Sequence, residues 1–178
     1  MGLNMCRYLS ICVSIKKMEL KHIEYVIELE REAFPTPWPK NFFFQDLLSD
    51  YAQNFVSVLK NGVAEKVVGY ICAWTIHDEC SINKIACHCR YRRMGIGAML
   101  LKHLMKESYI KGARIFSLEV REFNIAAQSF YQKFNFIKTG IRKGYYSDTK
   151  EDAIVMGLHV SELLDREEKQ QLSERTWY

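Results

Sequence analysis

The chain has 178 residues, which is the length of one domain with a substantial hydrophobic core. Hydrophobic residues make up 48% and charged residues 26%, as is typical of a soluble globular protein, and no apolar run approaches the roughly 20 residues of a membrane span. The net charge of +4 suits an anionic ligand or the surroundings of a ribosome, but it is too small to indicate nucleic-acid binding.

The sequence predicts one domain over residues 11–160, preceded by a leader at 1–10 and followed by a charged tail at 161–178 that we expect to be a surface helix. Apolar periodicity predicts the elements of the first half in the order strand, helix, helix and three strands: 11–17, 20–34, 40–48, 54–59, 66–76 and 81–89. Pro35 ends the first helix, and Asn61-Gly62 marks a hairpin turn between the second and third strands.

In the second half, the pattern predicts a long helix, a strand, a short helix and two final strands: 95–111, 114–121, 124–134, 136–142 and 152–159. Gly112 is a C-terminal stop for the long helix, and Asn124 is an N-cap for the short one. We expect Tyr145-Tyr146 to lie in the loop between the last two strands.

None of the six cysteines belongs to a C-x-x-C pair. Cys87-His88-Cys89 has the composition of a metal site, but on a strand Cys87 and Cys89 point to one face and His88 to the other, so these ligands do not converge. The sequence therefore predicts reduced thiols and no metal, with a disulfide through Cys6 as the alternative.

The segment from Arg92 to Gly97 follows a predicted strand and opens the long helix. Gly95 and Gly97 allow a tight turn and a close approach of the backbone to a ligand, and the helix directs unpaired N–H groups to the same place. This combination predicts a phosphate or pyrophosphate site, although it is not a Walker loop because Lys-Ser/Thr does not follow the second glycine. Taken alone, the arginines at 90, 92 and 93 also fit a solvated basic turn.

The strand at 114–121 alternates apolar with polar residues, so Glu119 lies on its polar face. A glutamate in a central strand is unusual, because both faces of such a strand are normally buried. We therefore expect Glu119 to face a cleft or an ordered water, where it could act as a general base. The alternative is a surface carboxylate on an edge strand.

Together these segments resemble the GNAT acetyltransferase superfamily, most closely its branch of ribosomal-protein, archaeal and eukaryotic N-terminal acetyltransferases. The resemblance covers about residues 15–157, and its landmarks are Glu32-Ala33-Phe34-Pro35, Pro37-Trp38, Val68-Gly69-Tyr70, Ile85-Ala86, Tyr91 to Gly97, Leu118-Glu119-Val120-Arg121, Asn124, Tyr131, Tyr145-Tyr146 and Glu151-Asp152-Ala153. It implies the GNAT fold, an α/β (α+β) architecture with a mixed, mostly antiparallel sheet of about seven strands flanked by about four helices.

The resemblance also implies acetyl-CoA as cofactor, with coenzyme A as product. The residues that would hold it lie on the strand before the glycine loop, in that loop and at the start of the long helix: Ile85, Ala86, Cys87, Arg92, Arg93, Met94, Gly95, Ile96, Gly97 and Ala98. Asn124 and Tyr131 would contact the coenzyme as well.

In the family the glutamate at the position of Glu119 is the base, and the tyrosine at the position of Tyr131 is the acid. Helical spacing alone makes Tyr131 a packed core residue. Phe34, Pro35, Tyr145 and Tyr146 would form the walls of a slot that admits a protein N-terminus and excludes an internal lysine.

Two residues depart from the pattern of many relatives, which have Pro in place of Cys89 and Gly in place of Asn135. Asparagine tolerates the left-handed conformation, so we expect the turn at Asn135 to be retained.

The sequence thus predicts a cytoplasmic N-terminal α-amino acetyltransferase, monomeric or weakly dimeric, that acts on ribosomal or other proteins. One alternative is the same chemistry on a lysine, polyamine or small-molecule amine. An alternative of another class is a non-catalytic acyl-CoA-binding subunit.

Overall fold

The computed structural model describes residues 12–61 and 64–160, so the predictions for the leader, the hairpin turn and the tail lie outside the described residues. The elements are, in chain order, β1 (Cys12–Lys17), the 3₁₀ turn η1 (Leu20–His22), α1 (Ile23–Ala33), α2 (Lys40–Leu47), β2 (Ala52–Asn61), β3 (Ala64–Ile76), β4 (Glu79–Cys87), the 3₁₀ turn η2 (Cys89–Tyr91), α3 (Ile96–Ile110), β5 (Ile115–Arg121), α4 (Ile125–Gln132), β6 (Ile137–Tyr146) and β7 (Glu151–His159). This order of strands and helices confirms the predicted one. No helix in the described ranges is long and apolar enough to cross a membrane.

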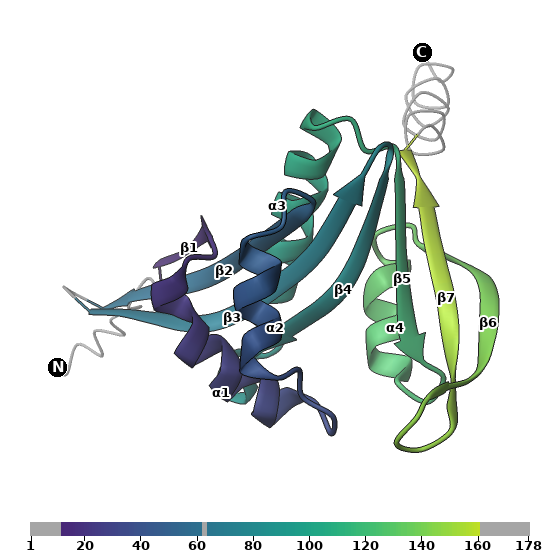
Figure 1. The fold of residues 1–178 in the computed structure, drawn as a ribbon, viewed down its shortest axis with the longest axis horizontal. Helices are drawn as coiled ribbons and strands as arrows, with labels where there is room; N and C mark the ends of the chain where they lie inside the picture. Colours follow the sequence, from purple (N-terminus) through teal and green to yellow (C-terminus); the bar gives the residue numbers. More distant parts are fainter. Residues whose placement is uncertain (1–11, 62–63, 161–178) are drawn as a thin grey trace, which may run out of the picture.

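One seven-stranded sheet runs through the molecule in the order β1-β2-β3-β4-β5-β7-β6 (Figure 1). Every neighbouring pair is antiparallel except β4 and β5, which are parallel. The pairing of β4 with β5 extends only from Glu79 opposite Ile115 to Ile82 opposite Leu118. Beyond that point the two strands separate, and the gap between them widens toward the lower end of Figure 1.

Helices cover the two faces of the sheet unequally. In Figure 1, α1 and α2 lie over β2, β3 and β4, whereas α3 and α4 lie behind the sheet. Each pair of helices closes its own hydrophobic core, with Leu100 and Leu104 of α3 fully buried on one side and Phe43 of α2 on the other. In the described part of the chain, no helix covers the front face of β5, β7 and β6. This half of the sheet is therefore accessible from the front.

Two predicted boundaries are wrong. Tyr145 and Tyr146 belong to β6 rather than to a loop, because a register shift after Arg142 absorbs Gly144 and lets Tyr146 pair with Glu151. The strand predicted to reach Cys89 ends at Cys87, since the N–H of Tyr91 bonds to the carbonyl of His88 and closes the 3₁₀ turn η2. The sequence predicted no metal at Cys87-His88-Cys89 because side chains alternate along a strand. Cys89 is not part of the strand, so this reason does not apply to it.

Candidate active site

The loop between β4 and α3 has the geometry of an anion site. Gly95, the residue before the helix, has φ +83°, and Arg93 has φ +64°. The N–H groups of the first turn of α3, at Ile96, Gly97 and Ala98, have no acceptor within the helix and point toward the loop. The side chain of Arg92 donates through Nε to the carbonyl of Cys87 at 3.2 Å, which ties the loop to the end of β4.

A cavity of about 1250 Å³ opens beside this loop. Its lining comes from the end of β4, the loop, α3, α4 and the segment after α4: Cys87, Tyr91, Arg92, Arg93, Gly95, Ile96, Gly97, Ala98, Lys102, Met105, Ile125, Ala126, Ser129, Phe130, Lys133, Phe134 and Asn135. Four of these residues are cationic and several are apolar, so the cavity suits a ligand that carries phosphates and an apolar arm.

Sequence reasoning missed Lys102 and Lys133. Lys102 lies four residues after Ala98, so helical spacing places both on one face of α3, and this signal could have identified it. Lys133 follows α4 and enters the cavity only because α4 packs beside α3, which no local pattern reveals. Asn135 has φ +64°, as predicted for the residue that stands in place of glycine.

Five of the predicted coenzyme residues do not line the cavity: Ile85, Ala86, Met94, Asn124 and Tyr131. Ile85 and Ala86 pair with β3 along one edge of β4, and they lie beyond the last residue of β4 that pairs with β5. Asn124 caps α4 as predicted, its side-chain oxygen accepting from the N–H of Ala127 at 3.1 Å.

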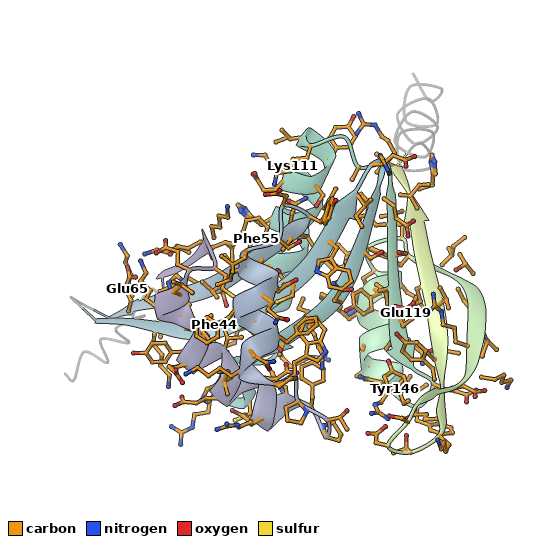
Figure 2. The ribbon with its side chains drawn as sticks, in the orientation of Figure 1. Phe44, Phe55, Glu65, Lys111, Glu119 and Tyr146 are labelled. Atoms are coloured by element: carbon orange, nitrogen blue, oxygen red, sulfur yellow. The ribbon has the colours of Figure 1, made fainter. Side chains whose placement is uncertain are left out.

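Glu119 lies on β5 one residue beyond the last pair with β4 (Figure 2). The burial of β5 alternates as predicted, with Phe116, Leu118 and Val120 buried on the α3–α4 side and Glu119 on the front face. Its side chain is 27% exposed, and its carboxylate is 3.0 Å from the guanidinium of Arg142. Glu119 is thus an accessible carboxylate on an interior strand, and not a residue of an edge strand.

Tyr131 lies in the core on the α3–α4 side of the sheet. Its ring packs 5.1 Å from that of Phe130 and 5.7 Å from that of Phe136, as measured between centroids. Burial raises the pKa of Tyr131 well above its usual value, and the neighbouring Tyr146 raises it further. The hydroxyl therefore keeps its proton at neutral pH. Tyr131 is the packed core residue that helical spacing predicts.

Tyr145 and Tyr146 at the end of β6 are held by two arginines, of which Arg142 lies 5.5 Å from the centroid of the Tyr145 ring. The rings of the two tyrosines meet edge to face with centroids 5.2 Å apart. Arg121 lies 4.0 Å from the ring of Tyr146 and forms ion pairs with Asp148 and Glu151, which fixes the turn after β6. Burial raises the pKa of Tyr146 to about 12, so this hydroxyl is also protonated at neutral pH.

Phe34, in the segment between α1 and α2, packs against Lys84, which also forms an ion pair with Glu30. Sequence reasoning missed this ion pair. The ammonium of Lys84 on β4 lies 3.7 Å from the centroid of the Phe34 ring and 2.9 Å from the carboxylate of Glu30. Glu30 is fully buried and also accepts from the Trp38 N–H and the Tyr70 hydroxyl. A carboxylate on the apolar face of α1 is the signal that could have revealed this cluster. Pro35 is exposed beside it.

The split mixed sheet and the anion loop at the start of α3 define an acyl-transfer fold. The sequence matches the Acetyltransferase (GNAT) family over residues 23–136, and the chain belongs to this family. It is therefore an acetyl-CoA-dependent N-acetyltransferase.

Two relatives specify the similarity further. The chain is 32% identical over 150 residues to ribosomal protein bS18-alanine N-acetyltransferase of Escherichia coli (strain K12), a match that covers 83% of this chain and 98% of the relative. It is 31% identical over 149 residues to the Haemophilus influenzae enzyme of the same name, with 82% and 98% covered.

Solved structures of N-acetyltransferases show the same similarity. The crystal structure of the ribosomal-protein-S18-alanine N-acetyltransferase from Escherichia coli superposes with a TM-score of 0.75 at 30% identity, covering 84% of this chain and 94% of that one. The structure of Ard1 from Thermoplasma volcanium superposes with the same TM-score at 26% identity, covering 84% and 99%.

Proposed function

We propose that this enzyme acetylates the α-amino group of protein N-termini, with Glu119 as the base and Tyr131 as the proton donor. The observation that carries the proposal is the position of Glu119 on the accessible face of β5, one residue beyond the last pair with β4, with Tyr131 buried on the other side of the sheet. Relatives more than 30% identical carry the name of an alanine N-acetyltransferase of a ribosomal protein. A ribosomal protein that begins with alanine is thus the first substrate to test, and such a substrate would place the enzyme in the cytoplasm.

The residues present fit acetyl-CoA. Gly95 at φ +83° turns the backbone, so the first N–H groups of α3 can receive a pyrophosphate, with Arg92, Arg93, Lys102 and Lys133 nearby. The strand edge of Ile85 and Ala86, which β5 leaves unpaired, offers backbone groups to an extended amide arm. Bound acetyl-CoA supplies the thioester whose acetyl group the amine accepts, with a thiolate as the leaving group.

Glu119 would take the proton that the attacking amine must lose. An N-terminal amine has a pKa near 8 and lysine one near 10.4, so at pH 7 roughly a tenth of N-termini are neutral, compared with fewer than about one lysine in a thousand. A single carboxylate with no supporting histidine suits the easier of these two deprotonations. The amine would approach from the front face, which no described helix covers over β5.

Tyr131 would hold and deliver a proton on the other side of the sheet. Its raised pKa keeps the hydroxyl protonated across the physiological range, as a proton donor requires. Phe34 and Pro35, together with Tyr145 and Tyr146, would form the walls of the acceptor slot. The support for this role is that Lys84 fixes Phe34 and Arg121 fixes Tyr146, since a selective slot needs rigid walls.

Turnover of acetyl-CoA with matched peptides tests the proposal. Each peptide would contain one internal lysine and would be supplied with a free or a blocked N-terminus. We expect acetylation of the free N-termini only, with alanine preferred at the first position. Acetylation of blocked peptides would instead establish a lysine acetyltransferase, and tight coenzyme binding without turnover on any peptide would indicate the non-catalytic alternative.

A further inference from the structure

Three side chains that bind metals come together at the end of α1 and the start of η2. Glu32 lies in the last turn of α1, whereas His88 and Cys89 follow β4, so 55 residues lie between the two segments in the sequence. One oxygen, nitrogen or sulfur atom from each of the three lies within 4.8 Å of the other two. Cys87 is not part of this cluster, because its side chain faces the cavity.

Hydrogen bonds already hold the cluster together. Glu32 accepts from the N–H of Cys89 at 3.0 Å. The Nδ1 atom of His88 lies 3.8 Å from the Cys89 sulfur and accepts from the N–H of Arg90 at 3.2 Å. Nδ1 is thus the unprotonated nitrogen of the ring, and this is the form in which histidine binds a metal.

We propose that Glu32, His88 and Cys89 form a zinc-binding site that joins the C-terminus of α1 to the loop before α3. A thiolate, an imidazole and a carboxylate are the ligand types that zinc takes. The carboxylate and the thiolate together balance the charge of the dication. Cys89 would bind as its thiolate and release its proton to solvent.

The spacing of the cluster is close to what the metal needs. With bonds of about 2.0–2.3 Å, ligand atoms in a tetrahedral zinc site lie roughly 3.5 Å apart, so the side chains must move inward by only about 1 Å. Glu32 and Cys89 are exposed, so both have room to move, and the fourth position would face solvent. Binding through Nδ1 would replace the bond from Arg90. Arg92 is a cation near Glu32 and would repel the bound metal. Its side chain, however, donates to the carbonyl of Cys87.

Zinc at this place would couple two segments of the proposed active site. Glu32 precedes Phe34 by two residues, and Cys89 precedes Arg92 of the anion loop by three. Bound metal would hold the ends of both segments together, so it should stabilise the folded chain as well as bind to it.

The test is a titration of the reduced, full-length protein with Zn²⁺ in competition with a chromophoric chelator. We expect one equivalent to bind, with affinity weakened roughly tenfold or more in Glu32→Gln and in Cys89→Ser. Added Co²⁺ should give a thiolate-to-metal charge-transfer band that Cys89→Ser lacks. Thermal melting should show a zinc-dependent rise in Tm for the wild type that is smaller in Glu32→Gln and in Cys89→Ser.

One control variant tests whether the result is specific to the cluster. Glu28→Gln changes an exposed carboxylate on α1 outside the cluster, so it should bind zinc like the wild type. Circular dichroism would verify the fold of every variant. Undiminished binding in Glu32→Gln and Cys89→Ser would overturn the proposal, as would a charge-transfer band that survives in Cys89→Ser.

Discussion

Arg142 of β6 reaches across β7 to form an ion pair with Glu119 of β5, with 3.0 Å between Nη2 and Oε1. In the sheet, Ala153 of β7 is the partner of both Arg142 and Arg121, so the two arginines share one register, two residues along β5 from Glu119. The proposed base is therefore paired with a cation before any amine arrives. An incoming ammonium group must compete with Arg142 for Glu119.

This competition predicts that Arg142→Gln lowers the KM for the acceptor peptide. The Arg142 side chain is 57% exposed, so the expected change is about two- to fivefold, with coenzyme binding unaltered. Steady-state kinetics with a free N-terminal peptide would measure it, with Lys138→Gln on the same strand as the control. A higher KM combined with a lower kcat would show instead that Arg142 positions Glu119.

Glu119→Gln should reduce kcat by about 100-fold or more, because the amide cannot accept the proton of the amine. Binding of acetyl-CoA should remain at the wild-type level, since Glu119 does not line the cavity. Calorimetry with coenzyme A and turnover assays would separate the two effects. Glu122→Gln, just after β5, is the matched control, and equal activity in the two variants would exclude Glu119 as the base.

Tyr131→Phe should lower kcat while the protein stays folded, because the buried ring is kept and only the hydroxyl is lost.

Tyr131→Phe should also change how the stability of the protein depends on alkaline pH. Folding raises the pKa of Tyr131 above its unfolded value of about 10, so its contribution to stability is complete below pH 10 and is lost as the pH rises toward the folded pKa. Urea unfolding at pH 8 and at pH 10.5 should show a smaller loss for Tyr131→Phe than for the wild type. Equal losses would contradict the raised pKa.

Lys84→Met should destabilise the fold by about 3 kcal/mol, because it leaves the buried Glu30 carboxylate without its cation. Urea unfolding measures this loss, and Lys66→Met, at an exposed position on β3, is the control. Adding Glu30→Gln to Lys84→Met should recover part of the stability, since the double variant contains no unpaired charge. No recovery would mean that Lys84 contributes through its contact with Phe34 instead.

Gly95→Ala should weaken coenzyme binding and cost about 1–2 kcal/mol of stability, because alanine is strained at φ +83°. No other atom lies within 4 Å of the added Cβ, so the effect comes from the backbone alone. Gly140→Ala is the control, since its Cβ would make only ordinary contacts with Val155. Calorimetric titration with coenzyme A would compare the two, and equal affinities would refute the role of Gly95.

Local patterns predicted most of the fold. The alternation along β5 placed Glu119 on the polar face, and the cap of α4 at Asn124 formed as expected. Both features depend on neighbours within a few residues. Features that depend on the packing of distant segments were not predicted, such as the ion pair between Arg142 and Glu119 and the approach of Glu32 to Cys89.

Tyr145 and Tyr146 show a second reason why local patterns did not predict the whole fold. The sequence predicted a loop at these residues. Gly144 has φ +58°, yet the strand continues because the sheet accommodates the irregularity as a register shift. A residue with positive φ can thus lie inside a continuous strand.

The separation of β4 from β5 has a kinetic consequence. In the proposed mechanism, the coenzyme enters through the cavity on one side of the sheet and the amine reaches Glu119 from the other, so the two reactants enter from opposite sides. Neither has to leave before the other can exchange, and both can be present at once. The peptide can therefore depart while the spent coenzyme is still bound, and a long protein chain that follows the acetylated residue never has to thread past the nucleotide.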